Sequence, residues 1–197
     1  CHYDILDWLT PDWVFDTASG TFQWGWPRRR PTIDLEIYQC RQADWALFAP
    51  HHYLDLPPMI AATHYMGLVG GQPVAHIVFS TRPGMAEARA CRLVVMPEWQ
   101  GAGVGMRFLT GCCALWLAGQ NRYGLPLRTL FHTSHPGLAA ALRRDARWTQ
   151  VSGTLYGSNK GRSRDTLRKS GKGSGFGGHF RAVQGFRYLG EEDTCTS

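Results

Sequence analysis

The residues best suited to chemistry lie in one glycine-rich turn. An apolar stretch ending in Val94-Val95-Met96 runs into a turn with glycine at 101, 103 and 105, and a helix-forming segment follows. The first amides of a helix lack partners within the helix and carry partial positive charge, and glycine lets an anion approach the backbone. The pattern predicts a pyrophosphate site made by Gln100, Gly101, Ala102, Gly103, Val104, Gly105 and Met106.

Two common phosphate motifs do not fit this turn. The Walker pattern ends in Gly-Lys-Ser/Thr, which Gly171-Lys172-Gly173 does not match. A dinucleotide fingerprint needs another glycine spacing and an acidic residue about 20 residues on, and residues 120–127 contain none. The remaining pattern, Gln-Gly-x-Gly-x-Gly after a Val-x-Pro strand end, resembles motif A of the GNAT superfamily of acyl-CoA-dependent N-acyltransferases.

That resemblance covers about residues 33–189 and implies acetyl-CoA, or another acyl-CoA, as cofactor. It implies that two strands splay beside the turn, and that the backbone of Leu93, Val94 and Val95 holds the pantetheine and the thioester carbonyl. The amides of Gly101–Met106 would hold the pyrophosphate, and Leu127–Thr133 would be the partner strand. Family members usually carry a tyrosine in the helix after that strand as the acid for the leaving thiolate, and Arg143 takes its place here.

Other residues could replace that acid and supply a base. The candidates are His52, Tyr53, Ser134 and His135, because imidazole accepts a proton near neutral pH and a hydroxyl can donate one to sulfur. Tyr53 could equally be a core residue and one neighbouring histidine solvated. His132-x-x-His135 offers two ligands, too few for a metal site, so no metal is expected.

A narrower resemblance concerns a GNAT subgroup found behind ABC-type ATPases and in phages. Pro50–Leu54, Arg92–Gly105 and Thr133–Pro136 are similar to it, and Cys1–Leu9 looks like the end of such an ATPase. A more distant similarity connects it to Mom-like DNA-modification proteins. These resemblances imply two partners, an ABC-type ATPase domain and nucleic acid.

Positive charge is concentrated in the second half of the chain. Residues 101–197 hold 14 Lys/Arg and 5 Asp/Glu, whereas residues 1–100 hold 7 and 10. The segment 157–178 has seven glycines and one Asp beside its cations, a composition that favours nucleic-acid binding. It could instead be a solvated loop or contact the 3′-phosphate of CoA. Its candidate residues are Lys160, Arg162, Arg164, Arg168, Lys169 and Lys172.

Strands and helices alternate in the rest of the chain. Strands are expected at 33–37, 65–69, 74–79, 88–96, 127–133, 148–156 and 179–189. Helices are expected at 44–53, where Pro50 breaks or ends the helix, and at 103–117 and 136–144. This order predicts an α/β (α+β) class with a mixed sheet of about seven strands. Residues 1–31 are expected to form a separate hairpin and linker, 32–190 the acyltransferase domain and 191–197 a tail.

Composition limits the remaining possibilities. No run of about 18 apolar residues exists, so no membrane partner is expected. The six cysteines contain no Cys-x-x-Cys pair and are expected as reduced thiols in a cytoplasmic protein. The sequence therefore predicts an acyl-CoA-dependent N-acyltransferase acting on an amine, including a nucleobase in DNA or RNA. The alternatives are a catalytically weak module docking an ATPase on nucleic acid, or a protein or small-molecule amine acetyltransferase.

Overall fold

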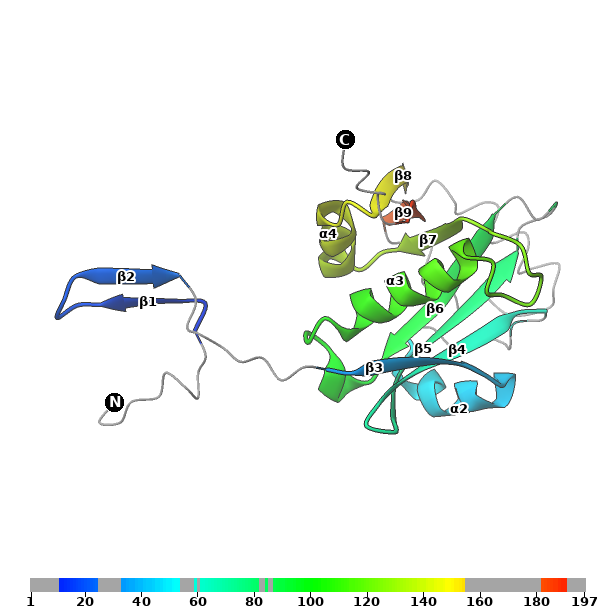
Figure 1. The fold of residues 1–197 in the computed structure, drawn as a ribbon, viewed down its shortest axis with the longest axis horizontal. Helices are drawn as coiled ribbons and strands as arrows, with labels where there is room; N and C mark the ends of the chain where they lie inside the picture. Colours follow the sequence, from blue (N-terminus) through cyan, green and yellow to red (C-terminus); the bar gives the residue numbers. More distant parts are fainter. Residues whose placement is uncertain are drawn as a thin grey trace. The chain divides into compact units, whose positions relative to one another are not determined.

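The computed structural model of the 197-residue chain describes residues 11–24, 33–53, 59, 61–81, 84, 87–154 and 182–190. The chain divides into two compact units, residues 1–33 and 34–197 (Figure 1). Among the described residues, no helix has the length and apolar character needed to cross a membrane.

The first unit contains a hairpin of two short strands, as the sequence predicts. β1 (Trp13–Asp16) and β2 (Thr21–Trp24) pair antiparallel, with Trp13 opposite Trp24 and Phe15 opposite Phe22. Residues two apart on a strand share a face, so all four aromatic side chains lie on one side of the hairpin. They are about half exposed or more, and neither Trp13 nor Phe15 belongs to the main sheet.

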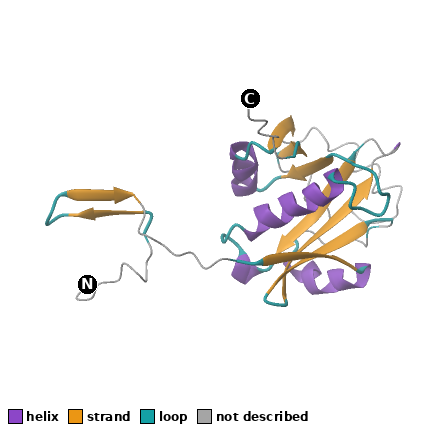
Figure 2. Cartoon of the chain, viewed as in Figure 1, coloured by secondary structure: helices purple, strands orange, loops and turns teal. Residues whose placement is uncertain are grey.

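The second unit is built on a mixed seven-stranded sheet, which confirms the predicted class (Figure 2). Its strand order is β3-β4-β5-β6-β7-β9-β8, and β6–β7 is the parallel pair. β5, the third strand in this order, is buried on both faces from Val74 to Phe79. The strands are β3 (Leu35–Cys40), β4 (Thr63–Val69), β5 (Gln72–Thr81), β6 (Ala88–Val95), β7 (Thr129–Thr133), β8 (Trp148–Thr154) and β9 (Val183–Tyr188).

Several strand boundaries differ from the prediction because pairing and local hydrogen bonds set them. β3 runs from Leu35 to Cys40 instead of 33–37, because β4 pairs with it as far as His64 opposite Cys40. β7 begins at Thr129 and not at Leu127, whose backbone N–H instead donates to the Trp116 carbonyl at 3.0 Å. The predicted residues 155, 156 and 179–181 of the last two strands lie outside the described residues.

The helix expected at 44–53, broken or ended by Pro50, is shorter and less regular than that range. The segment folds as a 3-10 helix (Gln42–Asp44), one turn of α-helix α2 (Trp45–Phe48) and a second 3-10 helix (Ala49–His51). Pro50 has no N–H for a helical hydrogen bond, so a regular helix cannot continue through it. The turn of α2 still buries Trp45 and Phe48.

Helices α2 and α3 (Val104–Leu117) cover opposite faces of the sheet. Val94 packs against Trp45 and Phe48 of the α2 region, whereas Val95 lies against Gly105 of α3. Consecutive strand residues point to opposite faces, so these contacts separate an α2 face from an α3 face. α3 lies so close to β3 that a Cβ on Gly111 would be 2.6 Å from Ile37 Cδ1, so glycine at 111 permits this packing.

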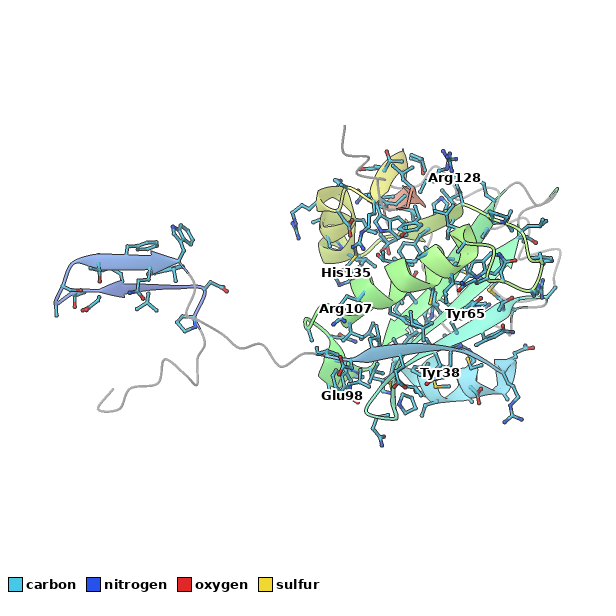
Figure 3. All side chains as sticks on the ribbon, viewed as in Figure 1. Tyr38, Tyr65, Glu98, Arg107, Arg128 and His135 are labelled. Carbon is cyan, nitrogen blue, oxygen red and sulfur yellow. The ribbon has the colours of Figure 1, made fainter. Side chains whose placement is uncertain are left out.

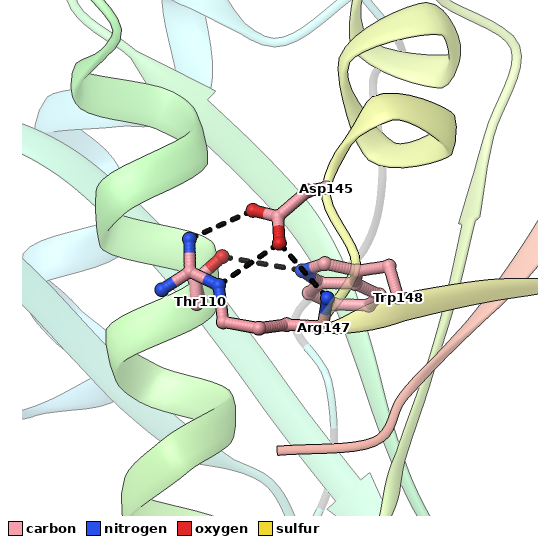
Figure 4. Close-up of polar contacts among 4 residues, drawn as sticks. All are labelled: Thr110, Asp145, Arg147 and Trp148. Carbon is pink, nitrogen blue, oxygen red and sulfur yellow. Dashed lines mark hydrogen bonds and ion pairs between the residues drawn. The ribbon is translucent and has the colours of Figure 1, made fainter. Parts of the chain in front are cut away.

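Helix α4 (Pro136–Arg144) is connected to β8 by a turn that side chains brace (Figure 4). Asp145 accepts two hydrogen bonds from the Arg147 guanidinium, at 2.9 and 2.7 Å, and one from the Arg147 backbone N–H at 3.0 Å. The indole N–H of buried Trp148 donates to Thr110 Oγ1 on α3 at 3.2 Å. These contacts tie β8 to α3.

Candidate active site

The glycine-rich turn forms an open cradle at the amino end of α3. Gly101 and Gly103 have φ of +82° and +80°, a region that glycine adopts without strain, and no atom lies within 4 Å of a Cβ built on either. At the start of α3 the backbone N–H of Arg107 donates to the Gly103 carbonyl at 3.2 Å. The amides of Val104, Gly105 and Met106 come before this bond and, as the first amides of a helix, have no acceptor within it, so they are available to a phosphate.

Gln100 braces this cradle with its side chain. Its Nε2 donates to the Val95 carbonyl at 2.9 Å, and its backbone N–H donates to the Pro97 carbonyl at 3.2 Å. The Gln100 amide thus belongs to the 3-10 helix Pro97–Trp99 and fixes the turn relative to β6. Arg107, exposed in the first turn of α3 (Figure 3), is a cation that the sequence reasoning missed.

The two central parallel strands separate beside the cradle. β6 and β7 pair only at three positions, from Ala88 opposite Thr129 to Ala90 opposite Phe131. Past this point β6 contains a bulge against β5, between the pairs Val78–Cys91 and His76–Val94. Arg92 occupies the bulge with φ of +55°. A bulge bends its strand, so the segment containing Leu93, Val94 and Val95 continues without β7 beside it.

A cavity of about 380 Å³ lies where the strands separate. Cys91 pairs with Val78, and His76 on the same face of β5 contacts Trp45 and Phe48, so the cavity is on the α2 face. Cys91 and Val95 pair with Val78 and Ala75 of β5, three strand residues apart, so this part of β6 spans about 10 Å toward the cradle. The cavity is lined by His52, Tyr53, Met59, Ser80, Arg89, Ala90, Cys91, Arg92, His132, Ser134 and Val183.

The fold brings three of the four acid–base candidates together. His52 and Tyr53 follow α2, Ser134 follows β7, and all three line the cavity. His135 has another position: its Nδ1 accepts a hydrogen bond from Leu138 N at 3.1 Å and caps α4. Arg143, which takes the place of the family tyrosine, donates to Gln150 Oε1 at 2.9 Å and to Gln184.

The lining also includes residues that the sequence reasoning did not select. Arg89, Cys91, Arg92 and His132 line the same cavity; the sequence had pointed to His132 only in the His132-x-x-His135 pair and to Arg92 only as the first residue of a resemblance stretch. Cys91 donates to Met59 Sδ at 3.3 Å, and burial raises the pKa of its thiol, so it stays protonated and is a poor nucleophile. The six candidate nucleic-acid residues from Lys160 to Lys172 lie outside the described part of the chain.

Metal and disulfide chemistry have no visible basis in the described residues. No three His, Cys, Asp or Glu side chains there gather into a group that could hold a metal ion. Cys40, Cys91, Cys112 and Cys113 carry free thiols.

Solved structures with the same arrangement of elements are acetyltransferases. The ribosomal-protein-S18-alanine N-acetyltransferase from Escherichia coli matches with a TM-score of 0.51 at 12% identity, over 81% of this chain and 98% of that one. An acetyltransferase of the GNAT family from Streptococcus pneumoniae matches with a TM-score of 0.52 at 10% identity, over 80% and 100%. The chain has the GNAT fold. No protein-family model and no curated protein matches the sequence.

A third GNAT-fold match was solved with a bound ligand. The streptothricin acetyltransferase from Bacillus anthracis, described as putative, is in complex with acetyl coenzyme A and has a TM-score of 0.50 at 14% identity, over 80% of this chain and 100% of that one. Identities this low establish the shared fold alone. The splayed strands of this GNAT fold are β6 and β7, the pair that the sequence resemblance implies.

Proposed function

We propose that this chain is an acyl-CoA-dependent N-acyltransferase that uses acetyl-CoA or a related acyl-CoA. One observation carries the proposal: the open cradle at the start of α3 and the cavity beside Cys91 lie at two ends of the stretch of β6 that pairs with β5 but no longer with β7. The amides of Gly101–Met106 would hold the pyrophosphate, and the backbone of Leu93–Val95 would hold the pantetheine arm. Glycine at 101 and 103 leaves open space beside the backbone, which lets a pyrophosphate approach these amides.

The chemistry needs one proton accepted and one donated. Acyl-CoA supplies a thioester carbonyl carbon that can form a C–N bond with an amine while the C–S bond breaks. His52 is our candidate to accept the proton that the attacking amine loses, because its imidazole lines the cavity. The hydroxyl of Ser134, or that of Tyr53, is our candidate to donate a proton to the departing sulfur. The protonated Cys91 favours direct transfer over an acyl-cysteine route.

A pair of matched glycine variants tests the cofactor site. Gly103→Asp places a carboxylate in the cradle, whereas Gly71→Asp places one in the β4–β5 turn at a similar φ, +80° against +75°, with no atom near either Cβ. Calorimetry should show that Gly103→Asp lowers acetyl-CoA affinity at least about 10-fold while Gly71→Asp keeps it. Unchanged affinity in Gly103→Asp would remove the assignment.

A nucleobase of DNA or RNA is a second candidate for the acceptor. The basic composition of 157–178 and the resemblance to Mom-like proteins support it. Replacing Arg162, Arg164, Arg168 and Lys169 by Gln should weaken oligonucleotide binding and flatten its salt dependence by about 0.9 per lost phosphate contact, with acetyl-CoA affinity unchanged. Equal binding by parent and variant at low salt would exclude this acceptor.

Docking of an ABC-type ATPase on nucleic acid is the non-enzymatic candidate, supported by the resemblance of Cys1–Leu9. A pure docking module has no reason to bind acetyl-CoA. Calorimetry with the unmodified chain therefore separates it from both enzymatic proposals.

A further inference from the structure

The cavity beside the splayed strands has an unusual charge balance. Its lining contains two guanidinium groups, Arg89 and Arg92, and no Asp or Glu among the described residues that surround it. In the described part of the chain, the ion pairs are Asp145–Arg147 and Glu87–Arg187, and neither includes a cavity arginine. The site therefore presents positive charge that no carboxylate of the described residues neutralises.

Arg92 reaches this position through a strained backbone. A left-handed φ of +55° is uncommon for a residue with a Cβ, and such conformations concentrate at functional sites. The bulge also offsets Arg92 from the regular alternation of β6, so it lines the cavity together with its neighbour Cys91. The left-handed φ and the bulge together bring the Arg92 side chain to the cavity, whereas in a regular strand it would point to the face opposite Cys91.

The partly buried position of Arg92 makes its positive charge unfavourable unless an anion binds beside it. Its guanidinium lies 5.8 Å from the ring centroid of Trp45, and burial lowers the pKa of the group. A partly desolvated cation is stabilised when an anion binds it, and a guanidinium binds carboxylate or phosphate through two parallel hydrogen bonds. Arg89, exposed and opposite Ser80 on the same face, adds a second positive charge at the cavity.

We infer that the acceptor of this enzyme is a small amine that carries a carboxylate or a phosphate, which Arg92 and Arg89 bind. The inference rests on the proposed acyltransferase function and specifies its substrate class. A cavity of about 380 Å³ is the size of a small-molecule site. Two arginines without an opposing carboxylate would repel a polyamine or a lysine side chain, so the same charges select against cationic acceptors.

The test is a panel of matched acceptors with acetyl-CoA, read by mass spectrometry of the acylated product. One arm compares amino acids with their carboxamides, and the other compares nucleoside monophosphates with their nucleosides, so the two arms distinguish a carboxylate from a phosphate. We expect the anionic member of at least one arm to have a kcat/KM at least about 10-fold above its neutral partner. Preference for the neutral or cationic acceptors in both arms would overturn the inference.

The arginine itself is tested by Arg92→Gln, which removes the charge and keeps a Cβ at the same φ. This variant should lose the preference for the anionic acceptor while acetyl-CoA affinity stays unchanged. Arg41→Gln, an exposed arginine that does not line the cavity, is the matched control and should keep the preference. An unchanged preference in Arg92→Gln would contradict the assignment.

A binding readout covers the case in which no panel member is acylated. With CoA present, anionic amines should raise the Tm of the parent and not that of Arg92→Gln. No Tm shift with any anionic amine would reject the inference even when acetyl-CoA binds. Failure to bind acetyl-CoA in calorimetry would instead reject the proposed function.

Discussion

His64 and His76 face each other across β4 and β5 in the buried sheet, with His64 Nδ1 3.2 Å from His76 Nε2. Among the described residues, the other ring nitrogen of each has no hydrogen-bond partner. Burial lowers the pKa of both imidazoles, that of His76 to about 3; the charge of Arg92 adds to this effect on both, and Asp44 opposes it. The pair is therefore neutral in the folded protein at ordinary pH.

This pair should make the protein acid-sensitive. An unfolded histidine binds a proton near pH 6.5, so between about pH 6.5 and 3 the unfolded chain holds more protons than the folded one. The free energy of unfolding should therefore fall as the pH drops below 6.5, by about 2 kcal/mol at pH 5 for His76 alone. Denaturant titrations at pH 7.5 and 5 measure this loss.

Two variants identify the source of that acid sensitivity. His76→Gln cannot titrate and keeps an amide that can bond to His64 Nδ1, so its stability should depend less on pH. The exposed His51, replaced by Gln, should leave the pH dependence as it is in the parent. The same steep loss in His76→Gln would show that other groups cause it.

The strain at Arg92 predicts that two substitutions differ in their effect on stability but not in their effect on acceptor preference. Arg92→Gly relieves the left-handed φ, whereas Arg92→Ala keeps it, so the glycine variant should be more stable than the alanine variant by about 1 kcal/mol. Both variants should lose the guanidinium and with it the preference for anionic acceptors. Equal stability of the two, measured by denaturant unfolding, would mean that the bulge relaxes without strain.

The bond between Trp148 and Thr110 should contribute to stability away from the active site. Thr110→Val keeps the shape of the side chain and leaves the buried indole N–H without its acceptor, which costs about 1–3 kcal/mol. Thr110→Ser retains the hydroxyl and should lose less. Thermal unfolding that ranks the serine variant as the less stable of the two would contradict this role.

The proposed proton donors predict a specific kinetic defect. Removing the hydroxyl that protonates the leaving sulfur, by Ser134→Ala or by Tyr53→Phe, should lower kcat about 100-fold without changing acetyl-CoA affinity. Steady-state kinetics and calorimetry measure the two quantities. If both variants retain the parent kcat, the proton comes from another group in the cavity, with His132 the next candidate.

The sequence by itself determined the turns, helix starts and hairpin that depend on neighbouring residues alone. Glycine at 101 and 103 predicts positive φ and an open helix start because no other residue adopts that backbone as easily. Pro136 and the alternating aromatic residues of 13–24 predict α4 and the hairpin for similarly local reasons, and both were confirmed. A strand, a glycine turn and a helix in succession were enough to expect a GNAT fold.

The tertiary structure decided which distant residues share the cavity. His52, Arg92 and Ser134 belong to different elements, and only strand pairing and the bulge bring them to one place. Arginine gives no sequence signal for a left-handed φ, so the bulge at Arg92 could not be predicted. His135 was selected beside Ser134, yet it caps α4, because a side chain just before a helix can accept a hydrogen bond from a backbone N–H of the first turn. Local preference is set by neighbouring residues, whereas a site depends on contacts that form only when the whole sheet assembles.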